Sequence, residues 1–108
     1  MKYKVLFRIE KLKLIDKLKN KIKNLRNYMD DEGYEYDIEI VFSGDVVKHF
    51  EGDYSDFIDP KLDVALCNNA LNNHSIEPIN YRNIRTVKAG IGEIIERKAE
   101  DWIEFTIE

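Results

Sequence analysis

The stretch Asp63-Val64-Ala65-Leu66-Cys67-Asn68-Asn69-Ala70-Leu71 shows how the chain is built. Its short aliphatic run has the length and character of a buried strand, which we predict over residues 62–66. The two asparagines that follow suit a turn, and Ala70 and Leu71 can face inward from a short helix over Asn68–Asn73. The stretch therefore predicts a buried strand that turns directly into a helix. Cys67, the only cysteine of the sequence, lies at the junction.

The rest of the chain alternates between strand and helix patterns. Continuous or alternating apolar residues predict strands over residues 3–9, 36–42, 84–87 and 102–107, with Glu104, Thr106 and Glu108 facing outward in the last. Apolar residues three and four positions apart predict a long helix over residues 12–29. Shorter helices are predicted over residues 46–50, around Phe57, and after Gly90, where one side carries Ile91, Ile94, Ile95 and Ala99.

Strands that are separated by helices imply parallel crossover connections. The length of 108 residues fits one domain, and 44% apolar with 35% charged residues is ordinary for a globular protein. We therefore predict an α/β fold with a single domain over residues 1–108. Its architecture is a three-layer α/β/α sandwich around a mostly parallel five-stranded sheet.

Charge and hydropathy argue against several classes of partner. The formal net charge of −4 opposes general binding to nucleic acid or to an anionic membrane. The lysines of the long helix, such as Lys13, Lys17 and Lys21, are predicted to form its solvated side. No apolar run approaches the roughly 18 residues of a membrane span. A single cysteine and a start without a secretory pattern favour a reducing, cytoplasmic setting.

In open parallel sheets, ligands bind beyond the carboxyl ends of the strands. This rule places the candidate site on the loops that follow the predicted strands. Cys67 is the candidate nucleophile, and the other predicted site residues are Ser43, Gly44, Asn68, Asn69 and Gly90. At a strand-to-helix turn, free backbone N–H groups and the positive end of the helix dipole favour a thiolate.

Other interpretations of these residues stay open or are disfavoured. Cys67 can equally be a small buried hydrophobe that completes a core strand. His74 lies seven residues after Cys67, about two helical turns away, so a Cys/His hydrolase is disfavoured. The spacing of His49, His74 and Cys67 matches no metal motif, and we predict neither a metal nor a cofactor. Ser43-Gly44-Asp45 is shorter than a glycine-rich phosphate loop and is typical of a plain turn.

Two segments resemble the DsrE-like family of small sulfur-relay proteins. One runs from Val64 to Leu71, and the other from Val87-Lys88-Ala89-Gly90-Ile91 to Lys98-Ala99-Glu100-Asp101-Trp102. The opening strand and Val41-Phe42-Ser43-Gly44 also fit. Relatives often carry glycine where this chain has Asn68, His74-Ser75 and Asp101. The resemblance implies an α/β sheet, a homo-oligomer (trimer or hexamer), and a persulfide carried on Cys67.

The sequence thus supports two hypotheses. The first is an intracellular sulfur carrier or relay protein, in which Cys67 takes sulfur from a donor protein and passes it to an acceptor protein. The second is a noncatalytic oligomeric binding module in which Cys67 is structural.

Overall fold

The computed structural model describes residues 2–108 of the chain. Strands (β), helices (α) and 3₁₀ helices (η) follow one another in this order: β1 Lys2–Ile9, η1 Leu12–Leu14, α1 Ile15–Glu32, β2 Glu35–Phe42, η2 Gly44–Glu51, η3 Ser55–Phe57, β3 Leu62–Cys67, α2 Asn68–Asn73, β4 Ile84–Val87, α3 Gly90–Ala99 and β5 Ile103–Ile107. None of the described helices is long and apolar enough to cross a membrane.

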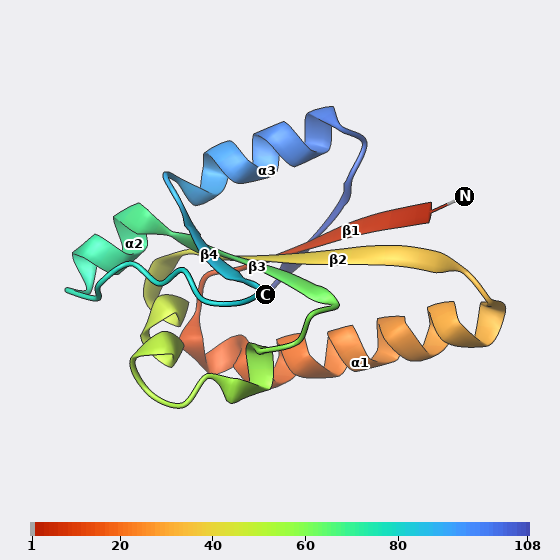
Figure 1. Ribbon diagram of the computed structural model, residues 1–108, viewed down its shortest axis with the longest axis horizontal. Coiled ribbons are helices and arrows are strands. Elements are labelled where there is room, and N and C mark those ends of the chain that lie inside the picture. Colours follow the sequence, from red (N-terminus) through yellow and green to blue (C-terminus); the bar gives the residue numbers. More distant parts are fainter. Residues whose placement is uncertain (1) are drawn as a thin grey trace.

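The five strands form one parallel sheet in the order β4-β3-β2-β1-β5. From β1 to β4 the chain moves across the sheet in one direction, and from β4 to β5 it returns the opposite way. Right-handed crossovers therefore put α1, the 3₁₀ turns and α2 on one face and α3 on the other. Figure 1 shows α1 and α3 on opposite sides of the sheet. The predicted three-layer α/β/α fold is confirmed.

The two faces of the sheet are covered very differently. On the α1 face, Leu18, Phe50, Phe57 and Leu71 pack with apolar residues of all five strands in one continuous core. On the α3 face, the fully apolar contacts are few and consist of Leu6, Val41, Ala65 and Ile94, with Val87 and Trp102 at the margin. The α3 face therefore needs a second source of stability.

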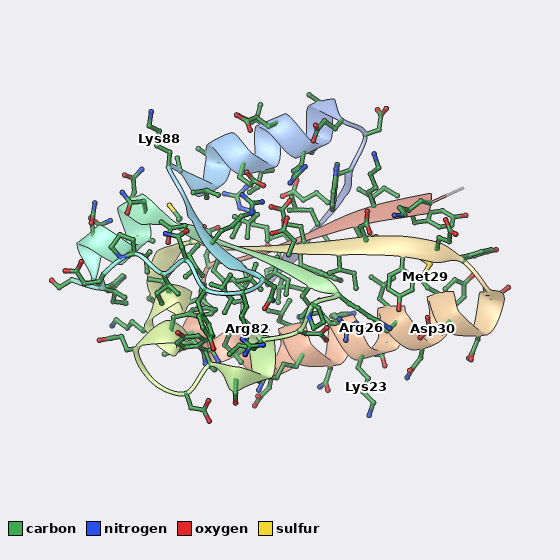
Figure 2. All side chains as sticks on the ribbon, viewed as in Figure 1. Lys23, Arg26, Met29, Asp30, Arg82 and Lys88 are labelled. Carbon is green, nitrogen blue, oxygen red and sulfur yellow. The ribbon has the colours of Figure 1, made fainter. Side chains whose placement is uncertain are left out.

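α1 owes its position to an apolar stripe and to a glycine at its end. Ile15, Leu18, Ile22 and Met29 are buried against the sheet. Figure 2 shows Met29 on the sheet side of α1 and Lys23 pointing away from it. Gly33 ends the helix at φ +72°, and the Tyr34 N–H donates to the Met29 carbonyl at 2.9 Å. This left-handed turn delivers the chain directly into β2.

All five strands lie where the sequence predicts them, with ends shifted by one residue or none, and Cys67 is the last residue of β3. Four details of the prediction are wrong. Residues 12–14 form a 3₁₀ turn before α1, and the helix predicted over residues 46–50 is also 3₁₀. Ile91 and Ile95 are exposed, because charged side chains take the inward side of α3. Glu104 is largely buried, whereas Phe105 is exposed, because β5 is an edge strand that α1 does not cover.

Candidate functional site

The carboxyl ends of β1 to β4 meet at one edge of the sheet, as parallel pairing requires. The loops at this edge bond to each other. The Ser43 N–H donates to the Ile9 carbonyl at 3.1 Å, and the Val46 N–H donates to the Glu10 carbonyl at 3.2 Å. The loop after β2 is thereby fixed against the end of β1.

Ser43, Cys67 and Gly90 come together at this edge, although they follow three different strands. A Cβ atom placed on Gly90 would lie 3.3 Å from Cβ of Ser43 and 3.5 Å from Cβ of Cys67. It would also lie 3.2 Å from Cγ1 of Val41. The lack of a side chain at Gly90 lets the start of α3 close over the cysteine. These three predicted site residues form one cluster, which we call the Cys67 cluster.

Cys67 is a free cysteine with 7% of its surface exposed. Its backbone is extended (φ −70°, ψ 117°), and α2 begins at the next residue. Asn68 and Asn69 are the first two residues of that helix, where backbone N–H groups lack carbonyl acceptors within the helix. The thiol thus lies at the predicted strand-to-helix junction.

Gly44 shapes the turn next to this cluster. Its φ is +79°, a left-handed conformation that glycine adopts without strain. A Cβ atom at this position would lie 2.7 Å from the Glu10 carbonyl oxygen. Gly44 is therefore required both by its backbone conformation and by the close approach of the end of β1.

His49 is engaged elsewhere, and His74 lies at the opposite end of α2 from Cys67. His49 Nε2 lies 3.1 Å from Asp56 Oδ1, and its ring packs against Phe50 and Phe57 in the core on the α1 face. His74 follows the last residue of α2. Within residues 2–108, no three His, Cys, Asp or Glu side chains are grouped to hold a metal ion.

A second cluster lies beneath α3, and the sequence analysis missed it. Its centre is Glu39 of β2, which has no exposed surface. Arg85 of β4 donates to Glu39 at 2.8 Å, and Arg97 of α3 donates to it at 3.0 Å. Arg85 also donates to Asp63 of β3 at 3.0 Å and to Glu93 of α3 at 2.6 Å. We call these five residues the Glu39 cluster; in Figure 2 the ends of polar side chains fill the space under α3.

Two carboxyl groups in this cluster differ sharply in their affinity for protons. Burial raises the pKa of Glu39 to about 9, and a hydrogen bond to Glu93 and the charges of Glu93 and Asp63 act in the same direction. Partial burial acts to raise the pKa of Glu93 too, but hydrogen bonds from Glu39 and Arg85 outweigh it and lower that pKa to about 2. Burial thus favours the proton on Glu39, whereas the contacts with Arg85 favour the ionised form of Glu93.

The Glu39 cluster connects α3 to three strands, and Gly90 of the Cys67 cluster is the first residue of that helix. The packing of α3 over Cys67 thus depends on polar bonds made further along the same helix. One signal in the sequence could have located the cluster. Glu39 interrupts the apolar run Ile38–Phe42 on a central strand, where a charged side chain needs partners.

The sequence matches no family model and no curated protein. Among solved structures, the chain is similar to one described as that of a protein of unknown function, MTH1491 from Methanobacterium thermoautotrophicum. The two share 25% sequence identity at a TM-score of 0.74, over 96% of this chain and 98% of that chain. The comparison shows a common fold over nearly the whole length of both. The resemblance to the DsrE-like family stays a prediction.

Replacing Gly44 with alanine is expected to destabilise the protein by about 2 kcal/mol or more, because a Cβ atom is strained in the left-handed region and meets the Glu10 carbonyl. The measurement is the free energy of unfolding in urea. Gly92→Ala is the matched control, since nothing lies within 4 Å of its Cβ position in α3. A Gly44→Ala protein as stable as wild type would contradict this role for Gly44.

The raised pKa of Glu39 predicts that the free energy of unfolding falls as the pH rises from 4.5 to about 9. Between the ordinary pKa of glutamate, 4.5, and the native value of about 9, the folded protein holds a proton that the unfolded chain releases. Over this range Glu39 lowers the free energy of unfolding by at most about 1.4 kcal/mol per pH unit. Glu39→Gln mimics the protonated form, so its stability should depend less on pH than that of wild type.

Denaturant titrations of wild type and Glu39→Gln at about pH 5, 7 and 9 measure this difference, because these pH values span the range between the unfolded and native pKa of Glu39. Glu39→Ala is the companion variant, and it should lose about 1.5–3 kcal/mol because Arg85 and Arg97 lose their shared acceptor. Parallel pH curves for wild type and Glu39→Gln would show that Glu39 is ionised in the folded protein.

Proposed function

We propose that this protein is a sulfur carrier that holds sulfur as a persulfide on Cys67. The observation that carries the proposal is the Cys67 cluster. The only thiol of the chain lies at the carboxyl edge of a parallel sheet, where Ser43 and Gly90 converge on it from separate loops. Neither histidine is placed as its base, which fits sulfur transfer better than hydrolysis.

The chemistry requires one nucleophile and no resident cofactor. In the loading step, the Cys67 thiolate attacks the outer sulfur of a donor persulfide, R–S–SH. A sulfur–sulfur bond forms to Cys67, the donor sulfur–sulfur bond breaks, and the donor leaves as the thiolate R–S⁻. In the unloading step, a thiolate of the acceptor attacks the outer sulfur on Cys67, and the Cys67 thiolate is restored.

The backbone adds support for the resemblance to DsrE-like proteins. Ser75 has φ 57° and Asp101 has φ 69°, so both adopt the left-handed conformation. These are two of the positions at which relatives often carry glycine, the residue that takes this conformation without strain. At these two positions the chain therefore has the left-handed backbone that glycine favours, although the residues are serine and aspartate.

The resemblance also carries proposals about assembly and location. DsrE-like proteins form trimers or hexamers, and we extend a homo-oligomeric state to this chain. Donor and acceptor proteins with reactive thiols are the proposed partners, and the cytoplasm is the proposed location, because a persulfide carrier needs a reducing setting.

Incubation of the reduced protein with a small-molecule persulfide donor is expected to add the mass of one sulfur atom to the peptide that contains Cys67. Mass spectrometry of the intact chain and of its digest measures the gain, and a reductant should remove it. Cys67→Ser is the control and should gain nothing. The proposal fails if Cys67 gains no sulfur while it reacts with a small alkylating reagent.

The 7% exposure of Cys67 favours a second candidate, a noncatalytic oligomeric binding module with a structural cysteine. The two candidates differ in the reactivity of the thiol in the folded protein. A carrier should be alkylated quickly by iodoacetamide in the folded protein. A structural cysteine should react only after unfolding.

Gly90→Ala tests whether the space at the Cys67 cluster gives reagents access to the thiol. Its new methyl group would lie 3.5 Å from Cβ of Cys67, so alkylation should slow about tenfold in a carrier. Gly92→Ala, two residues further along the same helix and with free space around its Cβ position, should label at the wild-type rate. Equal rates in all three proteins would mean that Cys67 is reached by a route that does not pass Gly90.

A further inference from the structure

The two edges of the sheet are finished in different ways. At the β4 edge, the chain covers its own strand: the Tyr81 and Ile84 backbones exchange hydrogen bonds at 2.8 and 2.9 Å, and the Thr86 N–H donates to the Asn80 side chain at 3.1 Å. At the β5 edge, the described part of the chain provides no such cover, and β5 pairs with β1 alone. An uncovered edge strand is a template for a further strand.

The same strand exposes two large apolar side chains on one face. Ile103 is 49% exposed and Phe105 is 54% exposed. Phe105 lies beside Phe7 with a ring-centroid distance of 6.2 Å, so both side chains belong to the α1 face. Next to them, between β5 and α1, is a hollow of about 470 Å³ whose apolar lining includes Phe7, Leu25, Phe105 and Ile107.

We infer that β5 pairs antiparallel with β5 of a second copy of this chain across a two-fold axis, so that the two sheets join into one. A two-fold contact uses the same patch on both copies. An antiparallel pair meets this condition, because residues directly opposite each other exchange their roles. The axis then runs perpendicular to the sheet and leaves the α1 faces of both copies on the same side.

Charge excludes two registers of this pairing. The even-numbered residues of β5 belong to the α3 face, where Lys98 binds Glu104 at 3.2 Å. If the axis passed through Glu104, that carboxylate would oppose its own copy, and an axis through Thr106 would set Glu104 against Glu108. Like charges directly opposite are unfavourable. An axis through Phe105 opposes Glu104 to Thr106 and avoids both contacts.

The register centred on Phe105 also gives the best apolar contacts. Phe105 meets its own copy, and Ile103 meets Ile107, so every residue of β5 has an opposite partner. Aromatic and β-branched cross-strand pairs of this kind stabilise sheets. The exposed pair Ile103 and Phe105 becomes the centre of an apolar surface that continues into the hollow beside α1 of each copy. A second copy of the chain thus pairs the uncovered edge of β5, covers its exposed apolar side chains and avoids contacts between like charges.

The first test is the molar mass of the full chain by light scattering after size exclusion. An even number of copies is expected, because the contact pairs the chains two by two. Phe105→Glu should halve the mass, because the two-fold contact is lost. Tyr81→Glu, at the covered β4 edge and 48% exposed, is the matched control and should leave the mass unchanged. A monomer or trimer for wild type, or an unchanged mass for Phe105→Glu, would overturn the inference.

The second test reads the register directly and does not depend on the folding of Phe105→Glu. In a Cys67→Ser background, Phe105→Cys should form an interchain disulfide under mild oxidation, since the two sulfurs face each other across the axis. Ile103→Cys is the control on the same face. Its two copies would lie roughly 13 Å apart along the strands, beyond disulfide reach. Equal cross-linking of the two variants, or none in Phe105→Cys, would refute the register centred on Phe105.

Discussion

The hydrogen bonds that surround Glu39 are the constraint on which the rest of this structure depends. A parallel sheet needs cover on both faces, and here a single helix of ten residues, α3, covers one of them. Its inward side carries Glu93, Ile94 and Arg97, so apolar contact alone cannot hold it. Arg85 and Arg97 meet the carboxyl group of Glu39 from opposite elements. The polar groups thus do on the α3 face what Phe42, Phe50 and Phe57 do on the other, where their rings pack edge to face.

Because α3 carries residues of both clusters, it couples the Cys67 cluster to the Glu39 cluster. The helix begins at Gly90, where an added Cβ atom would lie 3.5 Å from Cβ of Cys67. Its third turn brings Arg97 over the ring of Trp102 and into reach of Glu39. A change in the charge of the Glu39 cluster acts on the same rigid helix that closes over Cys67. Geometry at the thiol is thus set partly by residues that never touch it.

The alternation of apolar patterns was sufficient to predict the fold, because parallel strands and crossover helices have distinct periods and lengths. The same reasoning placed Ser43, Cys67 and Gly90 at one edge, since parallel strands end together. It could not predict that Ile91 and Ile95 are exposed, because an apolar stripe does not reveal that the opposing strands present Glu39, Asp63 and Arg85. Those residues belong to three strands, and only the sheet register brings them together. The outward placement of Glu104 was wrong for a related reason: periodicity does not tell an edge strand from a central one.

The strand order has a consequence for how the chain acquires its structure. β1 to β4 can be added one after another, each beside the strand that precedes it, and their contacts form early because they are close in sequence. β5 instead pairs with β1, its most distant strand along the chain, which makes this the pairing with the largest loop to close. During synthesis, the free side of β1 must wait until β5 has left the ribosome. The backbone edge of residues 5–9, which pairs with β5, is therefore the part of the nascent protein most in need of protection.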